Sequence, residues 1–163
     1  MPVTAKVSVR TATPADASLI HQFILDLADY EKLLDTVTAS LADTTAALFG
    51  EAPRAFADIV EIDGQPVGFS LWFYSYSTFV GRHGIWLEDL FVRPAARGSG
   101  AGKALLANLA RRCVDEGLGR LEWSVLDWNA PSIAFYDSLG AAAMDEWIIR
   151  RLTDDGIREL AGA

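Results

Sequence analysis

Glycines crowd one short stretch of the chain, where small side chains stand between two cations. In order, the stretch reads Arg97, Gly98, Ser99, Gly100, Ala101, Gly102 and Lys103. It follows an apolar run and precedes an amphipathic segment, so it predicts a strand–loop–helix junction. Small residues let backbone N–H groups approach a ligand closely, and a helix N-terminus adds partial positive charge. The pattern therefore predicts a cradle for phosphate groups.

Two common nucleotide-binding motifs do not fit this stretch. The P-loop requires a glycine where Arg97 stands and a hydroxyl where Ala104 stands. The dinucleotide fingerprint, started at Gly98, requires a glycine where Lys103 stands, and it is expected in the first strand–helix unit of a parallel fold. A glycine-rich loop without a ligand is the remaining alternative.

The elements around this loop are predicted from periodicity. Strands are expected at residues 7–10, 55–62, 66–76, 85–92 (central), 121–126 and 144–152. Helices are expected from Thr13-Pro14, at residues 41–49 and 100–116, and from an Asn129 cap through residue 139. The helix expected at residues 100–116 carries an apolar stripe of Leu105, Leu106, Leu109, Ala110 and Cys113. The order predicts an α/β (α+β) fold with a mixed sheet, in a single domain covering residues 1–163.

The composition of the 163 residues indicates a folded protein, since 51% are hydrophobic and 22% are charged. The net charge of −8 disfavours general binding to nucleic acid or anionic membranes and favours a small cationic partner. No apolar run reaches the roughly 18 residues of a membrane span, and no secretory signal is visible. Cys113 is the single cysteine, and His21 and His83 stand apart, so we expect no metal site and a cytoplasmic location.

The glycine-rich stretch and its surroundings resemble the GCN5-related N-acetyltransferase (GNAT) family. Arg97-x-x-Gly100-x-Gly102 after a strand is similar to the family's acetyl-CoA diphosphate loop, and the resemblance extends from residue 7 to Trp147. Residues 86–92, 125–129 and 135–141 are similar to the diamine (spermidine/spermine) acetyltransferase branch. Within that branch, residues 76–79 and 125–129 most resemble the thialysine acetyltransferases. The resemblance implies the GNAT fold, a mixed and mostly antiparallel central sheet flanked by helices, with splayed central strands.

The resemblance implies acetyl-CoA as the coenzyme. Backbone groups of one strand would hold the pantetheine arm as an added strand, and a backbone N–H would polarise the thioester carbonyl. The coenzyme residues implied in this way are Leu90, Phe91, Val92, Arg97, Gly98, Ser99, Gly100, Ala101, Gly102, Lys103, Asn129, Ser132 and Tyr136.

The resemblance also assigns the proton transfers. An alkylamine has a pKa of about 10.4 and must lose a proton before it attacks, and Glu88 is implied as the water-linked base. Tyr136 is implied as the acid that protonates the departing thiolate. Strand alternation predicts opposite faces for Glu88 and Asp89, so one of them is expected to face the site, with Asp89 structural or attracting the cation. Solvated charges and core packing are the alternative readings of these residues.

Acidic and aromatic side chains suit an alkylammonium substrate. The implied substrate residues are Tyr30, Glu31, Tyr76, Phe79, Glu88, Asp89, Glu146 and Trp147. The polyamine enzymes resemble Tyr-Asp-Pro-Trp where this chain has residues 76–79 as Tyr-Ser-Thr-Phe, which removes an anionic contact for a second distant amine. The resemblance further implies a homodimer, in which Trp147 reaches the neighbouring subunit's site. Packing in the core or in the dimer interface is the alternative reading of Trp147.

These observations predict direct transfer of acetyl from acetyl-CoA to a primary amine. The expected acceptor is a thialysine- or lysine-like amino acid or a short diamine. A polyamine acetyltransferase, a non-catalytic CoA-binding regulator, and an enzyme that acetylates protein N-termini or lysines are the alternatives.

Overall fold

A mixed sheet of five strands in the order β1-β2-β3-β4-β5 dominates the first part of the chain in the computed structural model, which describes residues 5–163. Neighbouring strands are antiparallel from β1 to β4, and β5 pairs parallel to β4. The strands are β1 (Val7–Thr11), β2 (Phe56–Ile62), β3 (Gln65–Ser77), β4 (Arg82–Val92) and β5 (Leu121–Trp123). Residue contacts divide the chain into two units, Met1–Ser124 and Val125–Ala163.

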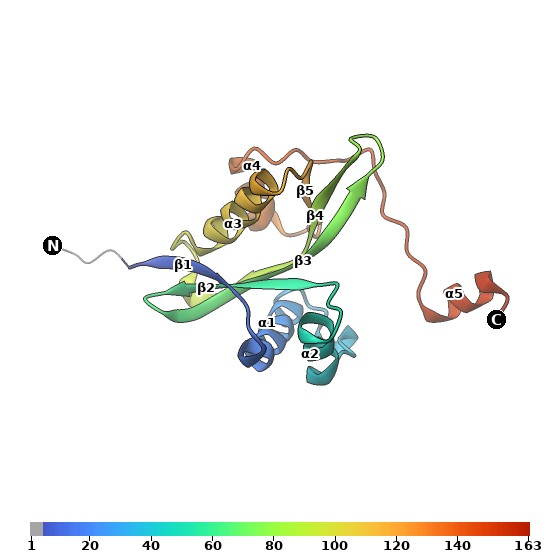
Figure 1. Cartoon of the computed structure of the whole chain (residues 1–163), viewed down its shortest axis with the longest axis horizontal. Helices are drawn as coiled ribbons and strands as arrows, with labels where there is room; N and C mark the ends of the chain where they lie inside the picture. Colours follow the sequence, from blue (N-terminus) through green and yellow to red (C-terminus); the bar gives the residue numbers. More distant parts are fainter. Residues whose placement is uncertain (1–4) are drawn as a thin grey trace. The chain divides into compact units, whose positions relative to one another are not determined.

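Helices cover both faces of the sheet in the first unit (Figure 1). Two of them, α1 (Ala17–Tyr30) and α2 (Leu41–Phe49), lie on one face and share a core with β2, β3 and β4. That core includes Ile20, Phe23 and Phe69, which are fully buried. On the other face, α3 (Ala101–Asp115) packs Leu105 against Val60 and against partly buried apolar residues of β1 and β4. The two cores hold the sheet between them and fix the ends of α1 and α3 relative to β4.

Local sequence signals explain where these elements begin. Ser40 and Asp43 form a reciprocal capping box at the start of α2, with Asp43 N–H donating to Ser40 Oγ over 3.1 Å. The turn at Asp63 and Gly64 has positive φ at both residues, as a two-residue hairpin between β2 and β3 requires. Short 3₁₀ turns occur at η1 (Pro14–Asp16), η2 (Leu34–Thr36) and η3 (Pro94–Ala96).

The second unit contains two short helices, α4 (Ala130–Ser138) and α5 (Asp154–Ala161). Asn129 caps α4, because its side-chain Oδ1 accepts a hydrogen bond from Ser132 N–H over 3.4 Å. Residues 148–153 between the helices form no regular element. Their apolar side chains are exposed, with Ile148 at 75%.

The predicted fold class is confirmed, and β4 lies inside the sheet with a neighbour on each side. The predicted strand at residues 144–152 is wrong, because these residues form no strand in the single chain: a strand needs a partner, and none pairs with them within the described residues. The strand predicted at residues 121–126 ends at Trp123, and α5 was not predicted. On α3 the three leucines are buried, whereas Ala110 is exposed and Cys113 is partly buried. The single domain over residues 1–163 stays a prediction.

Candidate active site

The glycine-rich loop connects η3 to the start of α3, as the sequence predicts. Gly98 and Gly100 adopt φ values of 79° and 88°, and Gly100 is the residue that caps α3. A Cβ at either position would meet no atom within 4 Å, so the left-handed backbone, and not crowding, requires glycine there. The helical hydrogen bonds begin with Ala104 N–H to Gly100 C=O at 2.9 Å. The N–H groups before Ala104 therefore have no carbonyl partner within the helix, and that of Ala101 donates to Ser99 Oγ over 3.3 Å.

Arg97 turns its side chain towards the sheet and α1. Its Nε donates to the Val92 carbonyl oxygen over 3.1 Å, and its guanidinium carbon lies 4.5 Å from the centre of the Tyr30 ring. The Phe91 ring is 6.0 Å from the same carbon. Arg97 therefore connects the end of α1 to the end of β4, while Lys103 at the start of α3 is exposed.

The end of β4 leaves one edge open, because β5 pairs with β4 only over Ile85–Leu87. Arg93 N–H donates to the Val67 carbonyl of β3 over 2.8 Å. Because successive residues of a strand direct their backbone groups to alternate edges, those of Val92 and Leu90 point away from β3. The bond from Arg97 to the Val92 carbonyl agrees with this orientation. Leu90 and Val92, predicted to hold an amide-bearing arm, thus present backbone groups at the edge where β5 has ended.

A β-bulge interrupts β4 just before this open edge. Leu71 of β3 is opposite Asp89, but the next residue, Trp72, is opposite Leu87, which leaves Glu88 as the extra residue. Strict alternation is lost here, so it no longer gives a reason to expect Glu88 and Asp89 on opposite faces.

The two carboxylates have different surroundings. Glu88 is exposed, and its Oε2 accepts a hydrogen bond from Trp86 Nε1 over 2.9 Å. Asp89 is partly buried opposite Leu71, which packs on the core beneath α1. Burial, and then the charges of Glu88 and Glu31, raise the pKa of Asp89 from 3.8 to about 7.

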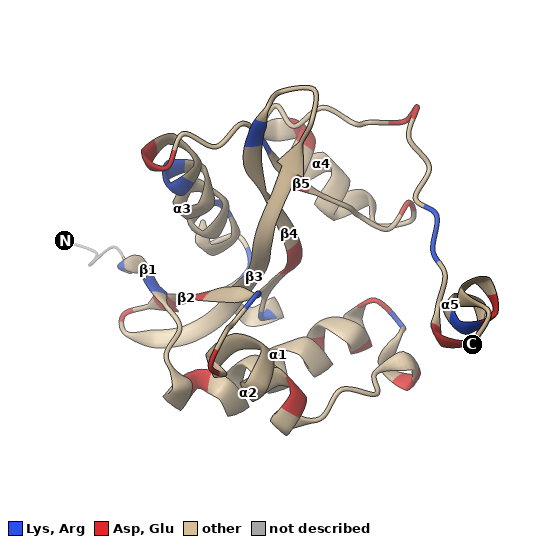
Figure 2. Ribbon diagram, turned by 45° about the vertical axis from the view of Figure 1, so that its right-hand side comes forward, with Lys and Arg blue, Asp and Glu red and all other residues tan. Residues whose placement is uncertain are grey.

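The end of α1 lies on the same side of the sheet as Asp89. Glu31 directly follows α1, burial raises its pKa, and its charge acts on Asp89. Figure 2 shows acidic positions both on β4 and at the end of α1. The structure therefore brings together four of the predicted substrate residues, Tyr30, Glu31, Glu88 and Asp89, beside the open edge.

Two other predicted substrate residues lie far along the same hairpin. Tyr76 of β3 is opposite His83, and their rings are 5.0 Å apart between centres. Phe79 lies in the hairpin turn and is 93% exposed. His83 and Asp89 are separated by six positions of β4, which corresponds to about 20 Å. Within the first unit, Tyr76 and Phe79 are thus not gathered with the carboxylates.

The remaining predicted residues belong to the second unit. Asn129 is buried, with its side chain engaged in capping α4 beside Ser132. Tyr136 is partly buried on α4 and its ring centre lies 5.4 Å from that of Phe135. Glu146 is exposed, and Trp147 is 71% exposed.

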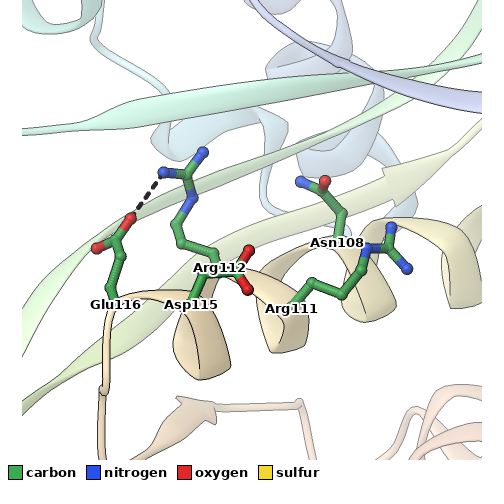
Figure 3. Close-up of a pocket in the computed structure, with 5 residues that line it drawn as sticks. All are labelled: Asn108, Arg111, Arg112, Asp115 and Glu116. Carbon is green, nitrogen blue, oxygen red and sulfur yellow. Dashed lines mark hydrogen bonds and ion pairs between the residues drawn. The ribbon is translucent and has the colours of Figure 1, made fainter.

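A polar cluster beneath α3 was not predicted. Asp58 is 2% exposed and accepts a hydrogen bond from Trp72 Nε1 over 2.9 Å. The Arg112 guanidinium lies 4.9 Å from the Trp72 ring centre and donates to Glu116 over 2.9 Å. A cavity of about 210 Å³ beside it is lined by Asn108, Arg111, Arg112, Asp115 and Glu116 (Figure 3). The sequence feature that could have predicted this cluster is Asp58, an aspartate among the apolar residues of β2.

This cluster ties α3 to β2 and β3. Burial raises the pKa of Asp58, which the Trp72 hydrogen bond and the positive charge of Arg112 oppose. Since Gly100 is the N-cap of α3, the cluster also fixes the helix that follows the glycine-rich loop.

Two further features concern membranes and metals. Among residues 5–163, no helix is both long and apolar enough to cross a membrane. Within the same residues, no group of three or more His, Cys, Asp or Glu side chains is arranged to hold a metal ion.

Sequence comparison connects this architecture to known enzymes. The model of the Acetyltransferase (GNAT) family matches residues 22–141. A thialysine N-epsilon-acetyltransferase of Bos taurus is 38% identical over 169 residues, with 97% of this chain and 99% of that protein covered. The L-ornithine N5-acetyltransferase NATA1 of Arabidopsis thaliana is 29% identical over 197 residues, with 93% and 86% covered.

Solved structures share the fold. An integron cassette protein from the mobile metagenome of V. cholerae has a TM-score of 0.79 at 24% identity, with 96% of this chain and 98% of that chain covered. An aminoglycoside N-acetyltransferase in complex with CoA has a TM-score of 0.72 at 20% identity, with 93% and 98% covered.

Proposed function

The chain belongs to the GNAT family of acetyl-CoA-dependent N-acetyltransferases, and from that premise we propose that it acetylates the side-chain amine of a small diamino acid such as thialysine, lysine or ornithine. The observation that carries this proposal is the gathering of Glu31, Glu88 and Asp89 beside the open edge of β4. Three carboxylates at one point favour a compact cation. Two of the relatives are named for acceptors of this kind: one is a thialysine N-epsilon-acetyltransferase and the other is an L-ornithine N5-acetyltransferase.

The residues of the first unit fit coenzyme A. The left-handed Gly98 and Gly100 and the N-terminus of α3 suit a diphosphate. The outward backbone groups of Leu90 and Val92 suit the amides of a pantetheine arm, which would continue the sheet where β5 ends. The coenzyme supplies the acetyl group as a thioester. Ser99, Ala101, Gly102, Lys103, Phe91 and Arg97 complete the proposed coenzyme site in this unit.

Arg97 has a positioning role in this proposal. Its side chain is engaged by Tyr30 and by the Val92 carbonyl, so it shapes the loop from behind. The contact also joins the amine side of the site, at the end of α1, to the coenzyme side. Loss of the ring of Tyr30 is therefore expected to weaken coenzyme binding.

Proton transfer in the proposed reaction needs a base and an acid. An acceptor ammonium with a pKa of about 10.4 must lose a proton before its nitrogen attacks. Glu88 and Asp89 both lie where the acceptor would bind, and a carboxylate of either kind is able to take that proton. Tyr136 of α4 is the proposed acid for the sulfur, with Asn129 and Ser132 as further coenzyme contacts.

The substrate proposal is tested by measuring release of free thiol from acetyl-CoA with a panel of amines. Thialysine, lysine, ornithine, putrescine, spermidine and spermine form the panel, and Nε-acetyl-lysine is the blocked control. We expect kcat/KM for the diamino acids to exceed that for spermidine by about tenfold or more, a difference of about 1.4 kcal/mol in transition-state binding. A reversed order indicates a polyamine enzyme, and coenzyme binding without thiol release indicates a regulator.

Tyr136→Phe tests the proposed acid. The phenol hydroxyl is lost while the ring remains, so turnover should fall by about 100-fold with little change in the Kd for acetyl-CoA. An undiminished rate removes Tyr136 from the mechanism.

A homodimer is part of this proposal. Residues 144–152 expose Met144, Trp147, Ile148, Ile149 and Leu152 in the single chain, a concentration of apolar surface typical of a protein interface. An unpaired segment of this composition suits contact with a second copy, through which Glu146 and Trp147 would act. Light scattering of the whole chain is expected to give twice the 17.7 kDa mass, and Ile148→Asp to shift it towards the monomer. A cytoplasmic location stays a prediction from composition.

A further inference from the structure

We propose that Lys32 is a specificity-determining residue, whose ammonium group binds the α-carboxylate of the diamino acid acceptor. The inference rests on the proposed function and deepens it, because it names the group that distinguishes an amino acid from a diamine. It starts from the position of Lys32, which directly follows Glu31 where α1 ends.

The carboxylates beside the open edge of β4 do not by themselves favour an amino acid. Glu31, Glu88 and Asp89 attract the ammonium groups of a diamine and of a diamino acid alike. They repel the α-carboxylate that only the diamino acid carries, and the net charge of −8 adds to that repulsion. A site for a diamino acid therefore needs a cation close to these carboxylates.

The chain has three lysines, and one of them stands at this point. Lys6 precedes β1, and its backbone N–H donates to the Asp63 carboxylate over 2.8 Å. Lys103 is in the first turn of α3, beside the loop proposed for the diphosphate. Lys32 is the lysine that adjoins a residue of the proposed acceptor site, and its side chain is exposed, so a dissolved acceptor is able to reach it.

The end of α1 holds Lys32 in a defined backbone conformation. Lys32 N–H donates to the Asp29 carbonyl over 3.0 Å and Leu33 N–H donates to the Ala28 carbonyl over 2.8 Å, which are the paired hydrogen bonds of a Schellman motif. The φ of Lys32 is 60°, in the left-handed region where such a motif usually has glycine. A lysine is unfavourable for the backbone at this position, which favours a functional role for its side chain.

Arg97 ties this end of α1 to the end of β4. Its guanidinium carbon lies 4.5 Å from the centre of the Tyr30 ring, and its Nε donates to the Val92 carbonyl oxygen over 3.1 Å. These contacts place the residues that follow Tyr30 beside the last residues of β4. They also engage Arg97 on the coenzyme side of the site. Lys32 therefore suits the carboxylate of the acceptor better than Arg97 does.

The charged groups of a diamino acid match the consecutive charges at the end of α1. The Cα atoms of Glu31 and Lys32 are about 3.8 Å apart, as across any trans peptide bond. In lysine or ornithine, a short methylene chain separates the side-chain ammonium from the α-carboxylate. The ammonium is thus able to lie among the carboxylates while the α-carboxylate accepts a charge-assisted hydrogen bond from Lys32. A diamine of the same length brings only a second ammonium towards Lys32, and like charges repel.

The test compares each diamino acid with the diamine that lacks only its carboxylate. Lysine is paired with cadaverine and ornithine with putrescine, and kcat/KM is measured for the full-length protein at one pH and one ionic strength. Lys32→Met should lower kcat/KM for the two diamino acids by about tenfold or more, with little change for the two diamines. Lys32→Arg keeps the charge and should retain most of the preference for the diamino acids. Lys6→Met, at an exposed lysine, is the matched control.

Lysinamide provides an independent check, because an amide replaces its carboxylate. The kcat/KM for lysinamide should be the same in the parent and in Lys32→Met. Calorimetry of the protein saturated with coenzyme A gives a comparison without turnover. There the Kd for lysine should rise about tenfold in Lys32→Met, while the Kd for cadaverine and the Kd for acetyl-CoA stay unchanged.

A purely structural role of Lys32 at the end of α1 predicts a different result. Such a role would change kcat/KM by the same factor for every acceptor, with or without a carboxylate. An equal fall for lysine and cadaverine in Lys32→Met, or an unchanged value for both, overturns the inference and leaves the proposed function standing. Absence of transfer by the parent to every amine contradicts the proposed function itself, and the inference with it.

Discussion

Replacement of Asp89 by asparagine should stabilise the protein at neutral and alkaline pH, because it removes a carboxylate whose ionisation opposes folding. The pKa of Asp89 is about 7 in the folded chain and 3.8 for the free side chain. The folded state therefore binds this proton more tightly than the unfolded state does. Stability from this group is fully present below about pH 4 and is lost as the pH rises to about 7.

The size of the effect follows from the two pKa values. They differ by about 3, and each unit corresponds to about 1.4 kcal/mol, so the full difference is about 4 kcal/mol. Between about pH 5 and about pH 8, the contribution of Asp89 to the free energy of unfolding falls by the equivalent of roughly two pKa units, which is about 3 kcal/mol. Because Asp89 keeps some exposure, solvent screens its charge, and we expect the advantage of the variant to grow by about 2 kcal/mol over this interval.

Urea unfolding followed by tryptophan fluorescence, at a series of pH values in one ionic strength, measures this difference. Asp35→Asn, at an exposed position, controls for the change of charge. The free energies of unfolding of the parent and the control should fall together as the pH rises. That of Asp89→Asn should lack this fall, because the variant has no carboxyl at this position. Parallel curves for Asp89→Asn and the parent would refute the argument that burial and neighbouring carboxylates hold the proton on Asp89.

Three further substitutions test other parts of the site. Gly100→Ala forces a left-handed backbone on alanine, so we expect a loss of about 1 kcal/mol in thermal unfolding and a weaker Kd for acetyl-CoA by calorimetry. Tyr30→Leu removes the ring beneath Arg97 and should raise the Kd for acetyl-CoA about threefold, whereas Tyr30→Phe should not, as about 0.5–1 kcal/mol of cation–π contact predicts. Asp58→Ala leaves the Trp72 indole N–H without its acceptor and should cost about 2–4 kcal/mol in urea unfolding, and a cost below about 0.5 kcal/mol would contradict the role given to the cluster.

Local signals in the sequence were sufficient to predict the elements on either side of the glycine-rich loop. Gly98 and Gly100 stand where the chain needs positive φ, and the leucine spacing of α3 gives its buried face. The hairpin at Asp63 and Gly64 is equally local. Each of these features depends on residues within a few positions of one another, so periodicity and turn chemistry predict them.

Features that depend on distant partners were not predictable in the same way. Alternation along β4 cannot reveal that Glu88 is an extra residue, because the bulge is defined by the register with β3. The apolar pattern at residues 144–152 indicates a strand without saying what it pairs with. The position of the Arg97 side chain over Tyr30 likewise depends on where α1 ends relative to β4.

Because β5 ends early, two backbone amides of β4 are able to report whether coenzyme is bound. The amide protons of Leu90 and Val92 face an edge without a β5 partner, since the pairing stops at Leu87. An arm that completes the sheet there would shield both amides, so their deuterium uptake should slow when coenzyme is added. Deuterium uptake at those two backbone positions, measured by mass spectrometry, would then follow ligand loading without a substrate or turnover.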